Sequence, residues 1–190
     1  MFKVNVGVSN HHIHLTKEAY EKLFKTPYNV YKELSQKGQF ATDKMVTIVG
    51  PKGQIERLRF LGPYRKYNQV EVSKSDAFLL GINPPVRQSG DLENSESIRV
   101  IGEDGEITLD SSVIIAEAHV HMSLEDLDKY GVKNKEQVLV KVNGNRVAYI
   151  RAIIKADETG VLELHIDRDE ANALLLEQGS QVEVIKWPLE

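Results

Sequence analysis

The chain has 190 residues, six histidines, no cysteine, and 24 Lys and Arg against 28 Asp and Glu, and 41% of it is hydrophobic. This length allows one large or two small domains, and the lack of cysteine excludes disulfide scaffolds, thiolate-bound zinc modules, iron–sulfur clusters and cysteine nucleophiles. The formal net charge of −4 argues against a nucleic-acid partner, and any metal ion must be bound by imidazole and carboxylate groups.

The N-terminus shows no targeting signal. Residues 1–12 lack the apolar core and cleavage site of a signal peptide, and no stretch of the chain approaches the roughly 20 apolar residues of a membrane span. We therefore expect a cytoplasmic protein with no membrane partner.

The first predicted strand carries a pair of histidines. Valines alternate with other residues over 4–8, and the alternation continues to His12 and His14. Because every second side chain of a strand points to the same face, the two imidazoles share a face. Thr16 is a good N-cap for a short helix over about 17–25.

Three residues before this pair are harder to interpret. The alternation points His11 away from His12 and His14, which argues against a shared role. Ser9 and Asn10 could donate hydrogen bonds to a ligand, although Ser and Asn at a strand end more often serve turns.

The segment 61–73 is also unusual. Arg65 and Lys66 follow a Gly-Pro turn, and two adjacent cations most often form a solvated edge. The planar guanidinium of Arg65 also suits bidentate phosphate binding, and Glu71 lies six residues on, in a predicted strand where it could complete a metal site. Both interpretations stay open.

A second pair repeats the pattern of the first. His119 and His121 form the polar face of a predicted strand over 114–122 whose other face is apolar. Ser123 then provides an N-cap with capping-box spacing for a short helix over about 124–130.

These repeats predict the fold. Segments 70–77 and 162–171 also resemble each other, allowing a one-residue offset, so we expect an internal duplication. Short strands and few helices indicate a mainly β fold of two small β-barrel domains, each capped by a helix, over residues 1–117 and 118–190. The alternative is one mixed α+β domain.

The clustered histidines predict a metal site. With His165, the two pairs offer five imidazoles, and a cysteine-free site of imidazoles plus a carboxylate is typical of catalytic zinc. A lone histidine would more often be an ordinary core or surface residue. If the halves pack face to face, the pairs could converge on one metal centre or on two adjacent ones.

The absence of several known catalytic motifs excludes further classes of enzyme. The chain has no G-x-S-x-G elbow, P-loop, Rossmann fingerprint or H-E-x-x-H zinc helix. Five segments together, nearly end to end and in the expected order, resemble the PduL-type phosphotransacylases, also called phosphate propanoyltransferases: residues 6–15, 62–73, 89–92, 116–123 and 164–172.

The resemblance implies a fold, an activity and site residues. It implies two β-barrel domains, two zinc ions per chain, a homodimer, and exchange of an acyl group between coenzyme A and inorganic phosphate. The zinc ligands that it implies are His12, His14 and Glu71 for one ion, and His119, His121 and His165 for the other. Arg65 resembles the phosphate-binding arginine, Ser9 and Asn172 match polar residues of the active site, and Ser9 and Asn10 are expected to contact coenzyme A.

The chain departs from the family in two respects. The family usually has arginine before each His-x-His, where this chain has His11 and Ala118. If those arginines neutralise substrate phosphates, affinity for coenzyme A or phosphate is lower here unless another cation substitutes. Members associated with bacterial microcompartments carry an amphipathic N-terminal extension, whereas the first strand here begins almost at Met1, so we expect a free enzyme or one recruited through partners.

The expected activity is therefore zinc-dependent phosphate acyl transfer. Propionyl-CoA or acetyl-CoA and phosphate would be interconverted with acyl phosphate and coenzyme A, by direct transfer in a ternary complex. A zinc-dependent phosphoester or thioester hydrolase on the same site is the alternative, because bound zinc can also deliver hydroxide. A third reading is a metal-binding or scaffold module without catalysis.

Overall fold

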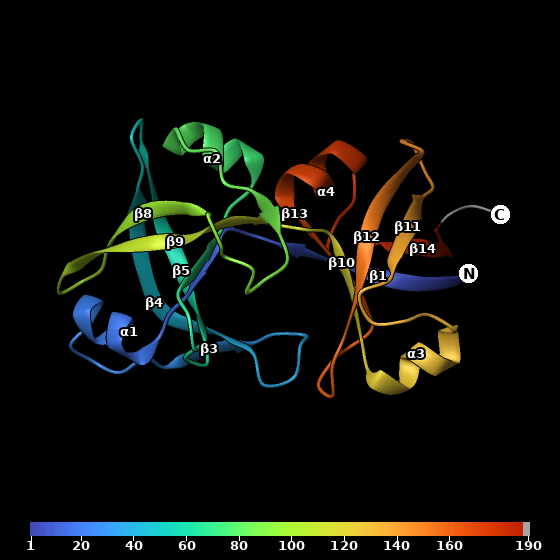
Figure 1. Ribbon diagram of the computed structural model, residues 1–190, viewed down its shortest axis with the longest axis horizontal. Coiled ribbons are helices and arrows are strands. Elements are labelled where there is room, and N and C mark those ends of the chain that lie inside the picture. The colour runs from blue at the N-terminus through green and yellow to red at the C-terminus, as the bar shows by residue number, and fades with distance from the viewer. Residues whose placement is uncertain (188–190) are drawn as a thin grey trace. The chain divides into compact units, whose positions relative to one another are not determined.

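The computed structural model describes residues 1–187. Contacts divide the chain into two compact units, which we call the N-terminal barrel (Asn10–Ala116) and the C-terminal barrel (Met1–Ser9 together with the residues from Glu117 on). Both are built mainly from β-strands (Figure 1). The predicted fold class, a mainly β protein of two small barrels with short helices, is confirmed.

The N-terminal barrel closes through six strands. Its order is β4-β5-β2-β6-β9-β8, with β8 returning to β4, while β3 and β7 extend the sheet beside β4 and β9. The elements are β2 (His12–His14), α1 (Lys17–Leu23), β3 (Val30–Glu33), β4 (Phe40–Val49), β5 (Gln54–Gly62), β6 (Gln69–Glu71), α2 (Lys74–Leu80), β7 (Val86–Arg87), β8 (Glu96–Ile101) and β9 (Glu106–Ala116).

The C-terminal barrel also closes through six strands, in the order β1-β13-β10-β12-β11-β14. Its elements are β1 (Phe2–Ser9), β10 (His119–Met122), α3 (Leu124–Tyr130), β11 (Gln137–Val142), β12 (Ala148–Ala156), β13 (Glu163–Asp167), α4 (Arg168–Leu174) and β14 (Gln181–Lys186). Among the helices of residues 1–187, none is long and apolar enough to cross a membrane.

The two barrels pair their strands in the same way. β2 lies parallel to β5 and antiparallel to β6, and β10 lies parallel to β12 and antiparallel to β13. β9 is parallel to β6 as β1 is to β13, and β8 and β14 close their barrels through antiparallel pairs. A duplication would leave such a correspondence, although the duplication itself stays a prediction.

The first strand lies in a different unit from the one expected. The sequence division grouped residues 1–117, whereas β1 is hydrogen-bonded to β13 and β14 and belongs to the C-terminal barrel. Val4 and Val6 of β1 are buried in the core of that barrel. β9 takes the equivalent place in the N-terminal barrel and directly precedes the second histidine pair, as β1 directly precedes the first.

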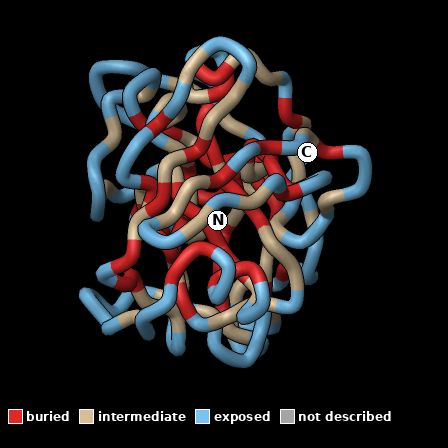
Figure 2. Tube along the Cα trace, turned by 90° about the vertical axis from the view of Figure 1, so that its left-hand side faces the viewer, coloured by how far each residue is buried: buried red, intermediate tan, exposed pale blue. Residues whose placement is uncertain are grey.

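Each barrel encloses a core of its own. Phe60 and Leu58 are among the fully buried residues of the N-terminal barrel, and Val120 and Leu164 among those of the C-terminal barrel. Figure 2 shows buried stretches of the trace mainly in the interior and exposed ones mainly where the trace turns at the surface. Burial of one such side chain stabilises a fold by about 1.5–3 kcal/mol, so the strands that carry the histidines are held by their apolar faces.

The helices begin directly after the strands that carry polar side chains. N-caps end these strands, and in each case the cap oxygen accepts a hydrogen bond from the third helical N–H. The caps are Thr16 after β2, Ser73 after β6, Ser123 after β10 and Asp167 after β13. Each cap fixes the end of its strand, and with it the direction of the last side chains.

Candidate metal centres

The structure brings the six expected metal ligands into two groups of three. In each group the candidate ligand atoms lie within 4.8 Å of one another, and each group lies within one barrel. The N-terminal centre consists of His12, His14 and Glu71, and the C-terminal centre of His119, His121 and His165.

Strand register assembles the N-terminal centre. His12 on β2 lies opposite Glu71 on β6, with 3.5 Å between Nε2 of the histidine and Oε2 of the glutamate. The Nδ1 atoms of His12 and His14 lie 2.8 and 3.2 Å from the carbonyl oxygens of Asn10 and Leu61. Because a carbonyl only accepts, both Nδ1 atoms carry the proton, which leaves Nε2 as the metal-binding atom of each ring.

The C-terminal centre is assembled by the equivalent pairing. His119 on β10 lies opposite His165 on β13, and the three ring centroids of the group lie 4.7–5.3 Å apart. Nδ1 of His119 donates to the carbonyl oxygen of Glu117 at 2.7 Å, so Nε2 of His119 is the atom available to a metal. The ring of His121 is buried beside the other two.

The environment keeps the buried rings neutral. Burial, followed by the charges of His12 and Arg65, lowers the pKa of His14 to about 3. Burial, followed by the charges of His119 and His165, lowers the pKa of His121 to about 2. A neutral imidazole is the form that binds a metal ion.

Both groups fit zinc. Three nitrogen or carboxylate ligands with a fourth position left for water or substrate are the usual donor set of catalytic zinc. The buried Nδ1 of His121 has no hydrogen-bond partner within residues 1–187, which is costly for a buried polar atom unless an ion or water satisfies it. The chemistry of the donors and this nitrogen therefore both favour a metal ion.

Arg65 lies close to the N-terminal centre. Its backbone N–H donates to the carbonyl oxygen of Leu15 at 2.8 Å, and its guanidinium donates to Oε1 of Gln39 at 2.9 Å. Its positive charge contributes to lowering the pKa of His14. The Nε atom of Arg65 is buried without a hydrogen-bond partner in the described part of the chain, so the guanidinium retains donor capacity for an anion.

The remaining expected site residues are distributed over both units. Ser9 ends β1 opposite Asp167, in the C-terminal barrel, and Asn172 is exposed on α4 of the same barrel. Asn10 opens the N-terminal barrel, where its carbonyl oxygen receives the hydrogen bond from His12. Contacts of these residues with coenzyme A stay a prediction.

His11 has a different environment from the other five histidines. Its Nδ1 lies 3.1 Å from Oδ2 of Asp76, whose carboxylate also accepts from the backbone N–H of Ser73 at the start of α2. The ring is therefore part of the connection between β2 and α2. As the strand alternation predicts, His11 is not part of the group formed by His12, His14 and Glu71.

Two residues that sequence reasoning missed contact the third ligand of each centre. Nε2 of Gln69 donates to Oε1 of Glu71 at 2.6 Å and to Oγ of Ser89 at 2.8 Å. Oε2 of Glu163 lies 2.7 Å from Nε2 of His165. Each precedes its ligand by two residues on the same strand face, and this spacing was the signal that could have identified both.

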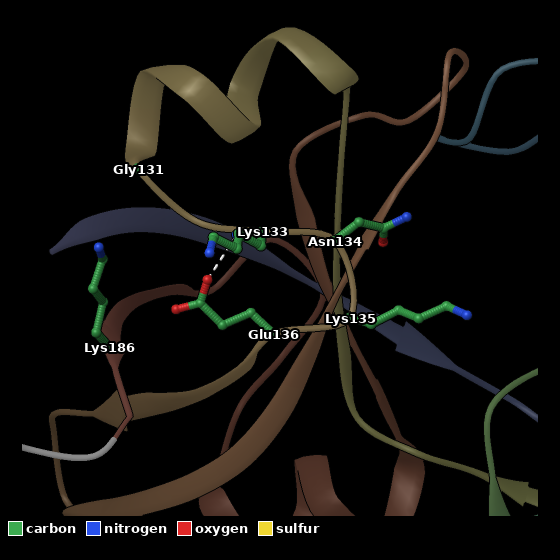
Figure 3. A pocket seen from close by; sticks show the side chains of 6 residues that line it. All are labelled: Gly131, Lys133, Asn134, Lys135, Glu136 and Lys186. Atoms are coloured by element: carbon green, nitrogen blue, oxygen red, sulfur yellow. Dashed lines mark hydrogen bonds between the residues drawn. The ribbon is translucent and has the colours of Figure 1, made fainter.

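A surface hollow of the C-terminal barrel offers positive charge and no histidine. Figure 3 shows its lining residues Gly131, Lys133, Asn134, Lys135, Glu136 and Lys186. The backbone N–H of Lys133 donates to Oε2 of Glu136 at 2.7 Å. None of the six candidate metal ligands lines it, so this hollow is separate from the C-terminal centre of the same barrel.

Comparison with known proteins gives a consistent result. A family model described as phosphate propanoyltransferase matches residues 5–177. The chain is 47% identical over 186 residues to the phosphate propanoyltransferase of Thermotoga maritima, covering 96% of this chain and 89% of that protein. It is 48% identical over 179 residues to that of Priestia megaterium (93% and 82%), and 45% identical over 174 residues to that of Limosilactobacillus reuteri (90% and 81%).

Proposed function

Because the chain belongs to the phosphate propanoyltransferase family of acyltransferases, we propose that it interconverts a short-chain acyl-CoA and inorganic phosphate with acyl phosphate and coenzyme A in a zinc-dependent reaction. The observation that carries the zinc dependence is the presence of three convergent ligands in each barrel. Propionyl-CoA is the first substrate to test, because the relatives are named for the propanoyl group.

The proposed reaction is a direct transfer. An oxygen of phosphate attacks the thioester carbonyl carbon, the new C–O bond replaces the C–S bond, and coenzyme A leaves as thiolate and takes up a proton from solvent. When bound, zinc supplies Lewis-acid polarisation of the carbonyl and stabilisation of the thiolate. The chain has no cysteine, so an acyl-cysteine intermediate is excluded. Direct transfer requires both substrates to be bound together.

The protein's own groups would prepare this reaction. Backbone carbonyls orient His12 and His14, so their rings need not reorganise during turnover. Arg65, whose buried Nε has no hydrogen-bond partner among residues 1–187, would bind the phosphate and offset its charge as it approaches the carbonyl. Burial of His12, His14 and His121 limits access of water, which would otherwise hydrolyse the thioester.

One assay separates the proposed transfer from the alternative hydrolase. Release of coenzyme A from propionyl-CoA and acetyl-CoA is measured with and without phosphate, and acyl phosphate is trapped with hydroxylamine. We expect release to require phosphate and to yield acyl phosphate in equal amount. Release at the same rate without phosphate would instead establish a thioester hydrolase.

Metal analysis tests the zinc dependence. We expect close to two zinc ions per chain, loss of activity on chelation and recovery on adding zinc. An enzyme that stays active after complete removal of metal would refute the proposed role of zinc. An unmodified chain that binds zinc but shows no activity would support a metal-binding module without catalysis.

Assembly and location are further parts of the proposal. We infer a homodimer and a cytoplasmic enzyme, either free or recruited to a bacterial microcompartment through partners. Sedimentation of the purified chain tests the first, and co-fractionation with microcompartment shells tests the second.

A further inference from the structure

Each barrel places a second polar side chain behind the third ligand of its centre. The strand registers make the two arrangements equivalent, because Gln69 lies opposite His14 as Glu163 lies opposite His121. In β6 the amide of Gln69 is followed two residues later by the carboxylate of Glu71. In β13 the carboxylate of Glu163 is followed two residues later by the imidazole of His165.

In the N-terminal centre the distances separate the two oxygens of Glu71. Oε1 accepts from Nε2 of Gln69 at 2.6 Å, while Oε2 lies 3.5 Å from Nε2 of His12. Two ligand atoms bound tetrahedrally to zinc at about 2.0–2.1 Å lie about 3.3 Å apart. The oxygen that faces His12 is thus spaced as a ligand, and the other is held by an amide whose own oxygen accepts from the N–H of Gly90 at 2.7 Å.

In the C-terminal centre the distances give a different role to Glu163. Its Oε2 lies 2.7 Å from Nε2 of His165, which is too short for two ligands of one zinc ion and is a normal hydrogen-bond length. An ionised carboxylate can only accept, so Nε2 of His165 carries the proton. Nδ1, on the opposite edge of the ring, is then the atom that can bind metal.

The neighbouring strand is shaped around this pair. A Cβ atom at Gly7 on β1 would lie 2.8 Å from Oε2 of Glu163 and 2.9 Å from Cδ2 of His165. The equivalent position on β9, by register, is Ile114. Only the C-terminal barrel therefore needs a residue without a side chain there, because only it packs a Glu–His pair against that strand.

We propose that Glu163 is a positioning residue that holds His165 with Nδ1 towards the metal of the C-terminal centre, and that Gln69 holds Glu71 in the N-terminal centre. Each centre then has one carboxylate. That of Glu71 binds the metal in the N-terminal barrel, and that of Glu163 lies behind the imidazole of His165 in the C-terminal barrel. This inference rests on the proposed function only in that both centres bind zinc.

Zinc affinity tests the role of Glu163. Glu163→Gln keeps the shape and removes the charge, and a His12→Ala background leaves the C-terminal centre as the one measured by competition with a chromophoric chelator. We expect the zinc dissociation constant to rise about 10–100-fold, as for other outer carboxylate partners of histidine ligands. Glu183→Gln on β14 removes a charge from the same barrel and should leave the dissociation constant unchanged.

The outcomes are distinguishable. Equal zinc affinity with and without Glu163→Gln, in a background that binds zinc, overturns the positioning role and leaves the proposed function standing. A chain that binds no zinc at this centre before any change at Glu163 overturns both. Glu163→Gln can also be tested in the cobalt-substituted protein, whose absorption bands report the coordination of the metal. Bands that indicate a changed coordination number in Glu163→Gln would identify Glu163 as a ligand and would also overturn the positioning role.

A second measurement needs no variant. In the zinc-loaded protein, two-bond proton–nitrogen NMR correlations of the histidine rings identify which nitrogen is protonated. We expect His165 to keep the proton on Nε2, and His12 and His119 to keep theirs on Nδ1, as their hydrogen bonds require. A zinc-bound Nε2 in His165 would overturn the inference whatever the effect of Glu163→Gln.

Discussion

At the scale of single residues, His11 distinguishes two otherwise equivalent helix starts. Asp76 and Glu170 each occupy the third helical position and complete a capping box. Burial raises the pKa of Asp76, but hydrogen bonds from His11 and Ser73 outweigh it and hold the pKa below its ordinary value. The C-terminal barrel has Ala118 where the N-terminal barrel has His11, and within residues 1–187 no histidine lowers the pKa of the corresponding carboxyl, that of Glu170.

The raised pKa of Glu170 therefore predicts that the free energy of unfolding depends on pH. Burial raises its pKa to about 7 from an ordinary value of 4.5, and Asp167 and Asp169 add to the rise. The folded state thus holds the proton more tightly, so its stabilising effect is complete below pH 4.5 and is lost as pH rises through about 7.

Replacing this carboxyl should remove that part of the pH profile. Glu170→Gln keeps an oxygen that can accept from the backbone N–H of Asp167. At pH 8 we expect the variant to be more stable than the unmodified chain, with a free energy of unfolding higher by up to about 3 kcal/mol. Near pH 4 the two free energies of unfolding should be equal. Urea unfolding at several pH values measures it, with Glu177→Gln as control. Parallel pH profiles would show that Glu170 is not protonated in the fold.

Arg65 gives a prediction about substrate use. If its guanidinium binds phosphate, Arg65→Ala should raise the KM for phosphate about 10–100-fold, which corresponds to the 1.5–3 kcal/mol of a charge-assisted hydrogen bond. The KM for acyl-CoA should change much less. Lys66→Ala is the matched control, because it removes the adjacent and exposed cation. An unchanged phosphate dependence with normal thermal unfolding would remove Arg65 from this role.

At the scale of elements, β1 serves both the core and the C-terminal centre. Gly7→Ala would place a methyl group against Glu163 and His165. We expect weaker zinc binding at the C-terminal centre and unchanged binding at the N-terminal centre, measured by stepwise chelator titration. Val8→Ala, the next residue of β1, removes apolar contact with the core instead and should lower thermal stability while keeping zinc affinity. Equal zinc affinity in both variants would contradict this picture.

Local signals explain which elements could be predicted from sequence. The strand alternation before His12 and the N-cap Ser123 depend on neighbours within a few residues, and the helices begin where these caps indicate. The two ligand sets followed from a resemblance spread over the chain, and the structure gathers each set in one barrel. The outer partners Gln69 and Glu163 were missed because a two-residue spacing has many explanations until the register across β2 and β10 is known.

At the scale of the whole molecule, the sequence could not show that β1 joins the C-terminal barrel. The valines of residues 4–8 predict a strand with one buried face, but nothing local specifies which barrel that face enters. Pairing of β1 with β13 joins residues more than 150 positions apart in sequence, since Val6 lies opposite Leu164. The division at residue 117 followed sequence order, whereas the observed units follow pairing.

Because β1 belongs only to the C-terminal barrel, its removal should affect the two barrels differently. Without residues 1–9, β13 and β14 each lose a partner and the sites of Val4 and Val6 become exposed. Two buried valines at about 1.5–3 kcal/mol each and the lost backbone hydrogen bonds at about 1 kcal/mol each together approach the 5–15 kcal/mol that stabilises a typical domain. The N-terminal barrel closes through β4, β5, β2, β6, β9 and β8 and contains no part of β1.

In a chain that lacks residues 1–9, we therefore expect hydrogen exchange to become fast throughout β10–β14 while β4–β9 stay protected. Zinc should then bind at a single centre per chain, with His12, His14 and Glu71 as its ligands. A synthetic peptide of residues 1–9 should restore both protection and the second zinc ion, whereas a peptide with Val4 and Val6 replaced by Asp should not. Equal loss of protection in both barrels would show that they fold as one cooperative unit, because removal of β1 leaves every strand pair of the N-terminal barrel intact.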